Sequence, residues 1–341
     1  MKKIVLGFIL LVSAAISTQG AEQHQLLNED IPDQYEVEKG DTLWDIAAIF
    51  LRDPWMWPEI WHANQRIDNP HLIYSGDLIS LVYIDGKPRL QVNRSRGYKL
   101  SPQIRTIDHQ QAVAALPLDT IDNFLSKSRV TSSAELNAAP YVLGGYERRL
   151  LMGMGDDFYA RGDFTDSQLT YGIYRRGDPY IEPSTGEVLG LRAKNVGSAK
   201  VKAIKDSIAT LGATRSVGEI RFKDRLLSRE ERSLASTFYP RAPKDKVAGV
   251  VLNVEGGVRN AGAFDVVALN RGDRDGLQAG DTLAIYKEGE MIKDRTADER
   301  IRLPDERIGL LMVFSTYEKM SFGLVMQADR QLDIGDLVRN P

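Results

Sequence analysis

Residues 35–81 constrain the fold more than any other part of this 341-residue chain. They begin with a short alternating segment, continue with a turn at Gly40, and then carry apolar residues at helical spacing over 43–51. Gly40 can adopt the positive φ of a sharp turn, and either Asp41 or Thr42 can cap the helix that follows. The pattern predicts a strand, a tight turn and a helix with one buried face.

The second half of this stretch predicts another helix and a closing strand. The helix is expected over 58–64, with Pro58 at its first position, although Pro54 offers an earlier start that would place Pro58 inside the helix. A polar loop and a turn occupy 65–77, and the apolar run 78–82 is typical of a strand. The predicted order is therefore strand, helix, helix, strand.

Two motifs in this order resemble the LysM module, a small domain that binds peptidoglycan and chitin. The front motif is Gly40-Asp41-Thr42-Leu43-Trp44-Asp45-Ile46-Ala47, and the back motif is Asn69-Pro70-x-x-Ile73-Tyr74-x-Gly76-Asp77. The resemblance implies a βααβ fold over residues 35–82 that binds N-acetylglucosamine-containing glycans in a shallow groove between two loops. Carried over by position, the glycan-binding residues are Gly40, Asp41, Thr42, Leu43, Asn69, Pro70, His71, Leu72, Ile73, Tyr74 and Gly76.

All four tryptophans of the chain lie in this stretch, at positions 44, 55, 57 and 61. Because a small domain needs large side chains to fill its interior, Trp44 and Trp61 are expected in the core. Two interpretations stay open for Trp55 and Trp57, namely packing within a loop or an exposed face that stacks on a sugar or a protein partner.

The first residues predict export. Residues 1–21 combine lysines, an apolar run and small residues in the order of a secretory signal peptide, and the run is shorter than the roughly 20 residues of a membrane span. Residues 22–34 are polar and predicted to be disordered. The chain has no cysteine, which excludes a lipoprotein anchor, disulfides and thiolate metal sites. We expect a periplasmic protein without a transmembrane segment in its mature chain, and the net charge of −3 gives no reason to expect nucleic acid as a partner.

Residues 83–140 are predicted to be a basic connector with short helices. Lysines and arginines gather between 87 and 105, either on a solvated connector or on a surface for an acidic partner or a phosphate-bearing envelope polymer. One helix is expected over 117–125, and another from Ser132 or Ser133 to Ala138.

From Tyr141 onward, short apolar runs are separated by Gly-Asp dipeptides, which are typical of turns between strands. The pattern repeats, since Arg-Gly-Asp at 161–163 and at 271–273 each precede a strand-like run. Each copy is predicted to end in a glycine, an acidic residue and an apolar residue. These ends are Val217-Gly218-Glu219-Ile220 in the first copy and Ile334-Gly335-Asp336-Leu337-Val338 in the second.

These repeats predict two diverged copies of one β-rich, barrel-like unit, over 141–225 and 247–341, joined by a linker at 226–246. The predicted fold class is therefore α+β and multidomain, with a βααβ module followed by the two β-rich units.

The whole mature chain resembles the type IV pilus secretin-associated family, which couples a LysM module to a region similar to that of a flagellar outer-membrane-ring-associated protein. The residues that carry this resemblance include Phe50-Leu51-Arg52-Asp53-Pro54-Trp55-x-Trp57-Pro58, Lys99-Leu100-Ser101-Pro102 and Phe158-Tyr159-Ala160-Arg161-Gly162-Asp163. The resemblance implies a non-enzymatic adaptor that binds peptidoglycan through the module and an outer-membrane secretin ring through the C-terminal region.

Two alternatives stay open: a LysM-targeted cell-wall hydrolase, and a peptidoglycan-bound structural factor of a flagellar or secretion-system ring. Thiol peptidases are excluded because the chain has no cysteine nucleophile. Only four histidines are present, His24, His62, His71 and His109, without the spacing of a zinc site, so no metal or other cofactor is expected. Muramidase chemistry needs only carboxylates, but its catalytic glutamate lies in a helical domain and the C-terminal half is predicted to be strands.

Overall fold

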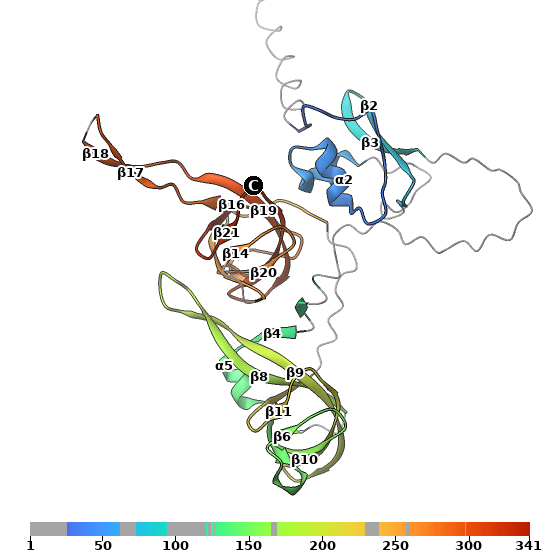
Figure 1. Cartoon of the computed structure of the whole chain (residues 1–341), viewed down its shortest axis with the longest axis vertical. Coiled ribbons are helices and arrows are strands. Elements are labelled where there is room, and N and C mark those ends of the chain that lie inside the picture. Colours follow the sequence, from blue (N-terminus) through green and yellow to red (C-terminus); the bar gives the residue numbers. More distant parts are fainter. Residues whose placement is uncertain are drawn as a thin grey trace, which may run out of the picture. The chain divides into compact units, whose positions relative to one another are not determined.

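A computed structural model of the protein describes residues 26–61, 73–93, 121, 124–125, 127–164, 169–228, 239–256, 260–296 and 298–341. The chain divides into two compact units, one comprising Met1–Pro117 with Thr237–Arg241 and the other Leu118–Ser236 with Ala242–Pro341. The first unit holds an N-terminal module, and the second holds two β-barrels (Figure 1). The predicted signal peptide at 1–21 lies outside the described residues.

The N-terminal module packs three helices against a three-stranded antiparallel sheet. The strands are β1 (Gln34–Glu36), β2 (Leu78–Ile84) and β3 (Lys87–Asn93), and the helices are α2 (Leu43–Phe50), η1 (Pro54–Met56) and α3 (Trp57–Ile60). Leu43, Ile46 and Phe50 on one face of α2 share a core with Ile79 of β2 and Leu90 of β3. The predicted strand, helix, helix, strand order is present, followed by one further strand.

Both prolines of the Trp-rich segment lie in the first turn of a helix. Pro54 is the first residue of η1 and Pro58 is the second residue of α3, where a missing N–H costs no hydrogen bond within the helix. The prediction for Trp61 as a core residue is only half right, because Trp61 is half-buried and meets the ring edge of the fully buried Trp57 at 6.2 Å. Tyr239, expected in a linker, packs on the same Trp57 ring at 6.0 Å.

The module is larger than the range 35–82 predicted for it. The residues expected to begin a basic connector form β3 instead, which pairs with β2 along its whole length through a turn at Asp85 and Gly86. In β3 the buried residues Pro88, Leu90 and Val92 alternate with polar residues that are exposed or half-buried. The charged residues among them made this segment resemble a connector instead of a strand. The predicted disordered lead is also partly structured, since Leu27 is buried in the core and bridges Leu51.

The first barrel is a ring of six antiparallel strands. They are β5 (Tyr141–Gly145), β7 (Asp157–Arg161), β8 (Thr170–Ile181), β9 (Val188–Lys205), β10 (Ile208–Ser216) and β12 (Arg225–Ser228), and β10 closes the ring by pairing with both β7 and β9. A two-stranded ribbon of β6 (Leu151–Met152) and β11 (Ile220–Arg221) accompanies the ring. The short turn η2 (Tyr146–Arg148), in which Glu147 and Arg148 have positive φ, precedes β6. The core contains the side chains of Phe158, Ile173 and Leu211.

Two further elements from the region predicted to be a connector belong to this barrel. β4 (Ser128–Thr131), which was not predicted, pairs with β9. The predicted second helix is present as α5 (Ser133–Ala138), with Ser132 as its N-cap. The helix predicted over 117–125 falls mostly on residues outside the description, although Ile121 is buried. The predicted linker also begins too early, because Leu226 of β12 is buried in the barrel core and Leu227 is buried in a second cluster with Leu136 of α5.

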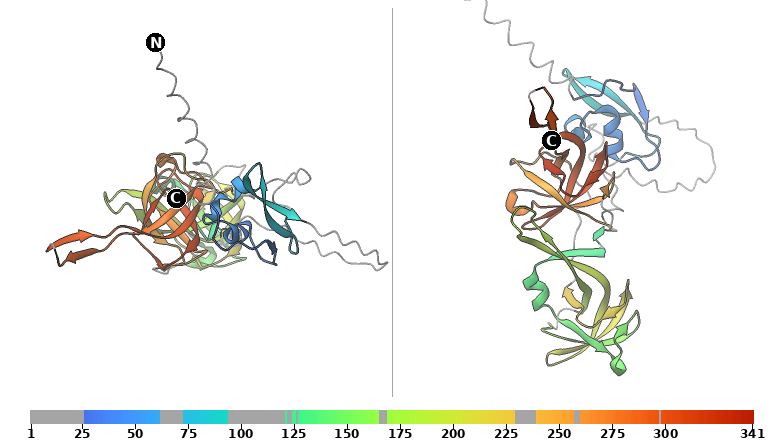
Figure 2. Two further views of the ribbon diagram at one scale, coloured as in Figure 1. Left: turned by 90° about the horizontal axis from the view of Figure 1, so that it is seen from above. Right: turned by 60° about the vertical axis from the view of Figure 1, so that its left-hand side comes forward.

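The second barrel is closed in the order β13-β15-β20-β19-β16-β22. Its strands are β13 (Ala248–Val254), β15 (Val266–Leu269), β16 (Thr282–Lys287), β19 (Glu306–Thr316), β20 (Ser321–Ala328) and β22 (Leu337–Arg339). It also has a ribbon of β14 (Asn260–Ala261) and β21 (Leu332–Asp333), the 3-10 turn η3 (Asp273–Asp275), and a hairpin of β17 (Met291–Asp294) and β18 (Glu299–Arg302) that reaches away from the barrel (Figure 2).

The two barrels have the same strand order. When the six ring strands of each barrel are numbered along the chain, both rings run 1-2-5-4-3-6. In each barrel the small ribbon pairs the segment between strands one and two with the segment between strands five and six. This correspondence supports the prediction of two copies of one unit.

The structure corrects one part of the predicted repeat. In the second barrel the Asp336 carboxylate accepts a hydrogen bond from the Asp333 N–H at 2.8 Å, and in the first barrel Asp224 accepts from the Arg221 N–H at 2.7 Å. The counterpart of Gly335-Asp336 is therefore Lys223-Asp224 and not the predicted Gly218-Glu219. Lys223 has a φ of 70° where Gly335 has 99°, and a non-glycine residue in this conformation conceals the match from sequence inspection.

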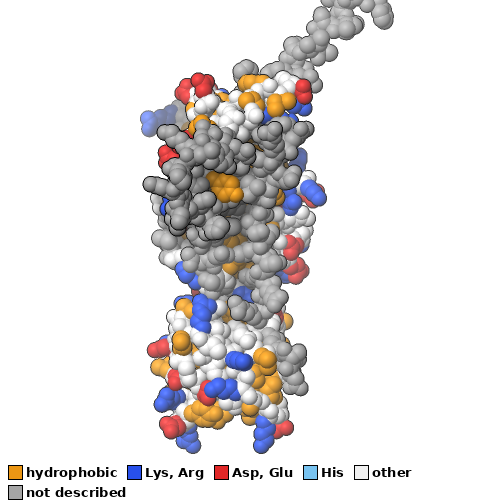
Figure 3. Space-filling model, turned by 90° about the vertical axis from the view of Figure 1, so that its right-hand side faces the viewer, with side chains coloured by type: hydrophobic (Ala, Val, Ile, Leu, Met, Phe, Trp, Pro, Cys, Tyr) orange, Lys and Arg blue, Asp and Glu red, His pale blue; other side chains and the backbone are white. Residues whose placement is uncertain are grey.

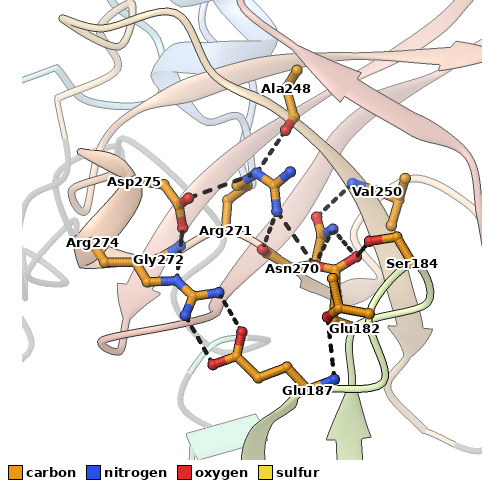
Figure 4. Close-up of polar contacts among 11 residues, drawn as sticks. Glu182, Ser184, Glu187, Ala248, Val250, Asn270, Arg271, Gly272, Arg274 and Asp275 are labelled. Carbon is orange, nitrogen blue, oxygen red and sulfur yellow. Dashed lines mark hydrogen bonds and ion pairs between the residues drawn. The ribbon is translucent and has the colours of Figure 1, made fainter.

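A polar network joins the hairpin between β8 and β9 to the second barrel (Figure 4). The Asn270 side chain, buried in the second barrel, donates hydrogen bonds of 3.0 and 2.8 Å to the two carboxylate oxygens of Glu182. Glu187, at the other side of the hairpin tip, accepts hydrogen bonds from Nη1 and Nη2 of Arg274 and from Nζ of Lys319. The two barrels therefore share one set of charged contacts.

Candidate glycan-binding site

The front loop of the module is held by a capping box. The Thr42 hydroxyl oxygen accepts a hydrogen bond from the Asp45 N–H at 3.2 Å, and the Asp45 carboxylate accepts from the Thr42 N–H at 2.9 Å. Both contacts satisfy backbone groups at the first turn of α2, where helical partners are missing. Thr42, predicted to bind glycan, is buried and its side chain caps the helix.

Asp41 fixes the turn that precedes this cap. One oxygen of its carboxylate accepts hydrogen bonds from the Glu38 N–H at 2.8 Å and from the Tyr35 hydroxyl at 2.9 Å. Burial and this hydrogen bond raise the pKa of Tyr35 to about 12, so the phenol stays neutral and donates. Gly40 lies between these groups with a φ of 106°, a conformation that L-residues adopt only with strain.

The back loop is held in a similar way by Asp77. Its buried carboxylate accepts from the Tyr74 N–H at 3.0 Å, and its own N–H donates to the Tyr74 carbonyl at 3.0 Å. Gly76, inside this turn, has a φ of 90°. The turn therefore depends on a glycine followed by an aspartate, and the same Gly-Asp pair forms turns beside several strands of the barrels.

Backbone hydrogen bonds tie the two loops together. The Val37 N–H donates to the Asp77 carbonyl at 2.9 Å, and the Gly76 N–H donates to the Val37 carbonyl at 2.8 Å. Val37 itself is buried in the module core. The structure thus brings the front and back loops side by side, as the LysM resemblance implies.

The predicted site residues fall into three groups. Gly40 and Gly76 are exposed, and a Cβ added to either would meet no atom within 4 Å, which leaves room for a ligand close to the backbone. Leu43 and Ile73 are buried in the core, so only their backbone groups are available to a ligand. Asn69, Pro70, His71 and Leu72 lie outside the described residues, and Tyr74 is half-buried beside Gly76.

Sequence inspection missed three residues that shape these loops: Tyr35, Val37 and Asp77. Two of them carry a readable signal. Asp77 follows Gly76 in the Gly-Asp pattern that recurs along the chain, and Val37 is the inward position of an alternating segment. The partnership of Tyr35 with Asp41 has no such signal, because it depends on the turn between them.

The match with known proteins falls on this module. Residues 35–81 match the family model of the LysM domain. They are a LysM domain. A segment of 39 residues is 44% identical to "Uncharacterized protein YqbP" of Bacillus subtilis (strain 168), which covers 11% of this chain and 18% of that protein. The chain thus matches less than a fifth of this relative.

The LysM domain indicates binding to peptidoglycan or a related carbohydrate. Exposed loop N–H and C=O groups can bind the amide and hydroxyls of an N-acetyl sugar, and glycine permits the close approach that such contacts need. Within the described ranges, His, Cys, Asp and Glu side chains form no group of three or more that could hold a metal ion. No helix in the part of the chain that the structure describes is both long and apolar enough to cross a membrane.

Proposed function

We propose that this protein is a non-enzymatic, exported adaptor that binds the N-acetylglucosamine-containing glycan of peptidoglycan through its LysM domain. The observation that carries the proposal is the pairing of the Gly40 and Gly76 loops through Val37. Both glycines are exposed and have positive φ, and a Cβ added to either would meet open space, which suits a shallow groove for a polymer.

We propose further that the two barrels anchor an outer-membrane secretin ring of type IV pili to the cell wall, in the periplasm. This part is supported by the resemblance to the secretin-associated family and by the residues of a secretory signal at 1–21. In a ring of many copies, weak glycan contacts add up, because each further contact forms at high effective concentration.

Glycine substitutions with a matched control test the glycan site. Gly40→Trp and Gly76→Trp fill the open space over the loops and should each reduce co-sedimentation with peptidoglycan sacculi. Gly86→Trp is the control, because Gly86 also has positive φ and an open Cβ position, but lies at the other end of β2, about 20 Å away for a strand of this length.

The expected result is weak sacculus binding for the first two variants and unchanged binding for the control, with all three folded by circular dichroism. Equal binding by all four proteins would refute the site. Soluble muropeptides released in the same tubes by the wild-type protein would identify a hydrolase instead.

The secretin is tested separately, by purifying the full chain from detergent-solubilised envelopes of cells that make pili. We expect the secretin to co-purify with both the wild-type protein and Gly76→Trp, since that substitution leaves the barrels unchanged. A preparation that contains peptidoglycan fragments but no secretin would refute the partner while leaving the glycan site intact.

A further inference from the structure

The ribbon of β6 and β11 on the first barrel carries a cluster of exposed large apolar side chains. Leu150 and Met154 are each 75% exposed, and three more apolar side chains of the same ribbon and its turns are at least half exposed: Leu151, Val217 and Phe222. The register places Leu151 opposite Arg221, so Leu150 and Phe222 occupy the next facing positions. We call these five side chains the ribbon face.

Packing in the first barrel does not require these outward positions to be apolar. Met152 and Ile220, the inward residues of the ribbon, are buried and fill the barrel end. Leu151 lies on the opposite side of the same strand, where a polar residue would cost no core contact. A cluster of exposed apolar side chains at such positions marks a binding surface rather than a packing need.

The second barrel provides an internal comparison, because its ribbon has the same register with Ala261 opposite Leu332. At the positions that correspond to the ribbon face it has Arg259, Asn260, Ala263, Asp329 and Ile334 in the sequence. Four of the five apolar residues are thus replaced by polar or small ones in a unit with the same strand order. The second barrel keeps two exposed apolar side chains at its ribbon, Phe264 and Ile334. The larger apolar cluster of the first barrel is therefore not dictated by the fold.

Basic side chains accompany the ribbon face. The two segments that form the ribbon and its turns in the first barrel, 147–156 and 215–223, together contain five basic and three acidic residues. The corresponding segments of the second barrel, 256–265 and 327–335, together contain two basic and three acidic residues. Arg149 and Arg221 form ion pairs with neighbouring acids, but Arg148 and Lys223 are exposed, and Lys223 lies 5.4 Å above the Phe222 ring. Figure 3 shows hydrophobic side chains next to Lys and Arg at the lower end of the first barrel.

The backbone also holds these basic residues in unfavourable conformations. Arg148 has a φ of 61° and Lys223 a φ of 70°, in a region where glycine or asparagine is usual. The second barrel has Gly335 at the position of Lys223. A lysine in place of the residue that fits the turn best points to a function for its charge.

We infer that the ribbon face docks on the surface of an anionic lipid bilayer. Apolar side chains on turns can enter the interface between headgroups and acyl chains, while basic groups beside them attract anionic headgroups. A two-fold contact between copies of this chain would set the same basic groups against each other, which favours a negatively charged surface as the occupant. The inference concerns the first barrel and is independent of glycan binding by the LysM domain.

Flotation of the purified full chain with lipid vesicles tests this inference. The chain should bind vesicles that contain phosphatidylglycerol and bind much less to vesicles of phosphatidylcholine alone. Met154→Asp with Phe222→Asp should lower the affinity by about tenfold or more, because it removes two inserted side chains and adds negative charge. The matched control is Ala263→Asp with Ile334→Asp, which adds the same charges at corresponding exposed positions of the second barrel and should bind as wild type does.

A second variant, Lys223→Gly, separates charge from folding. Glycine suits the positive φ at this position, so the variant should fold at least as well as the wild type and lose about fivefold in affinity for anionic vesicles. The inference is overturned if the wild-type chain binds neither kind of vesicle, as it would if the ribbon face docks on a protein. It is also overturned if the first-barrel and second-barrel double variants bind equally.

Discussion

The contact between Asn270 and Glu182 should stabilise both barrels, and Asn270→Ala measures its contribution. The Asn270 side chain is almost fully buried, accepts a hydrogen bond from the Val250 N–H at 2.7 Å, and donates to both oxygens of the buried Glu182 carboxylate. The substitution removes all three hydrogen bonds. The nearest remaining charged donor to Glu182 is Arg271, at 3.4 Å.

The expected loss of stability in Asn270→Ala follows from the two groups that lose their partner, the Glu182 carboxylate and the Val250 N–H. A hydrogen bond to a charged group contributes about 2 kcal/mol, and a half-buried N–H such as that of Val250, left without a partner, costs about 1 to 2 kcal/mol. Together they predict that the free energy of unfolding of the barrels falls by about 4 kcal/mol, within the range for breaking a buried charged pair. Ser184→Ala is the control, because it removes one hydrogen bond of 3.1 Å to the same carboxylate from an exposed position and should cost about 1 kcal/mol or less.

The position of the tryptophans makes the assay specific. All four lie at 44–61 in the LysM domain, so tryptophan fluorescence in a urea titration follows that domain, while far-UV circular dichroism is dominated by the strands of the barrels. Asn270→Ala should shift the dichroism transition to lower urea and leave the fluorescence transition in place. A loss of less than about 1 kcal/mol would refute the reasoning, because no unsatisfied buried group can then have been created.

Two further predictions concern protonation. Hydrogen bonds from Arg274 and Lys319 lower the pKa of Glu187 from 4.5 to about 2. The ionised carboxylate therefore stabilises the fold above pH 4.5, and this contribution is lost as the pH falls toward 2. In acid unfolding, the stability of Glu187→Gln should change less than that of the wild type over this range of pH. The neutral phenol of Tyr35, whose pKa is raised to about 12, stabilises the LysM domain at neutral pH. This contribution is lost as the pH rises from 10 through 12. Ultraviolet titration should show one tyrosine that ionises at unusually high pH, and Asp41→Asn should shift that ionisation to lower pH.

Local signals in the sequence predicted most of the turns, with Gly177-Asp178 as an exception, because this step lies inside β8. The Gly-Asp steps at 76, 155, 280 and 335 all have glycine at positive φ, because the turn needs that conformation and the aspartate carboxylate then reaches the N–H three residues earlier. The start of α5 was predicted at Ser132 or Ser133, and the structure shows that Ser132 is the cap, because its side chain accepts a hydrogen bond from the Glu135 N–H. Such features depend only on neighbouring residues.

Features that depend on pairing across long distances were harder to predict. β3 looked like a charged connector, because its inward residues Pro88, Leu90 and Val92 become recognisable only when β2 lies beside them. The bond from Asn270 to Glu182 joins residues 88 positions apart, and neither residue stands in a motif. In the proposed glycan site, the positive φ of Gly40 was predicted from the sequence, but the hydrogen bonds of Val37 with Gly76 and Asp77 were not.

The long β8–β9 hairpin has a mechanical consequence. β9 has 18 residues, which at about 3.3 Å per residue makes a strand about 60 Å long, and it is part of the wall of the first barrel for much of that length. Its tip is fastened to the second barrel by Glu182 and Glu187. A pull on the second barrel along the hairpin would load the backbone hydrogen bonds between β8 and β9 in shear, many at once, instead of opening them one by one. A chain built to resist traction would benefit from this arrangement.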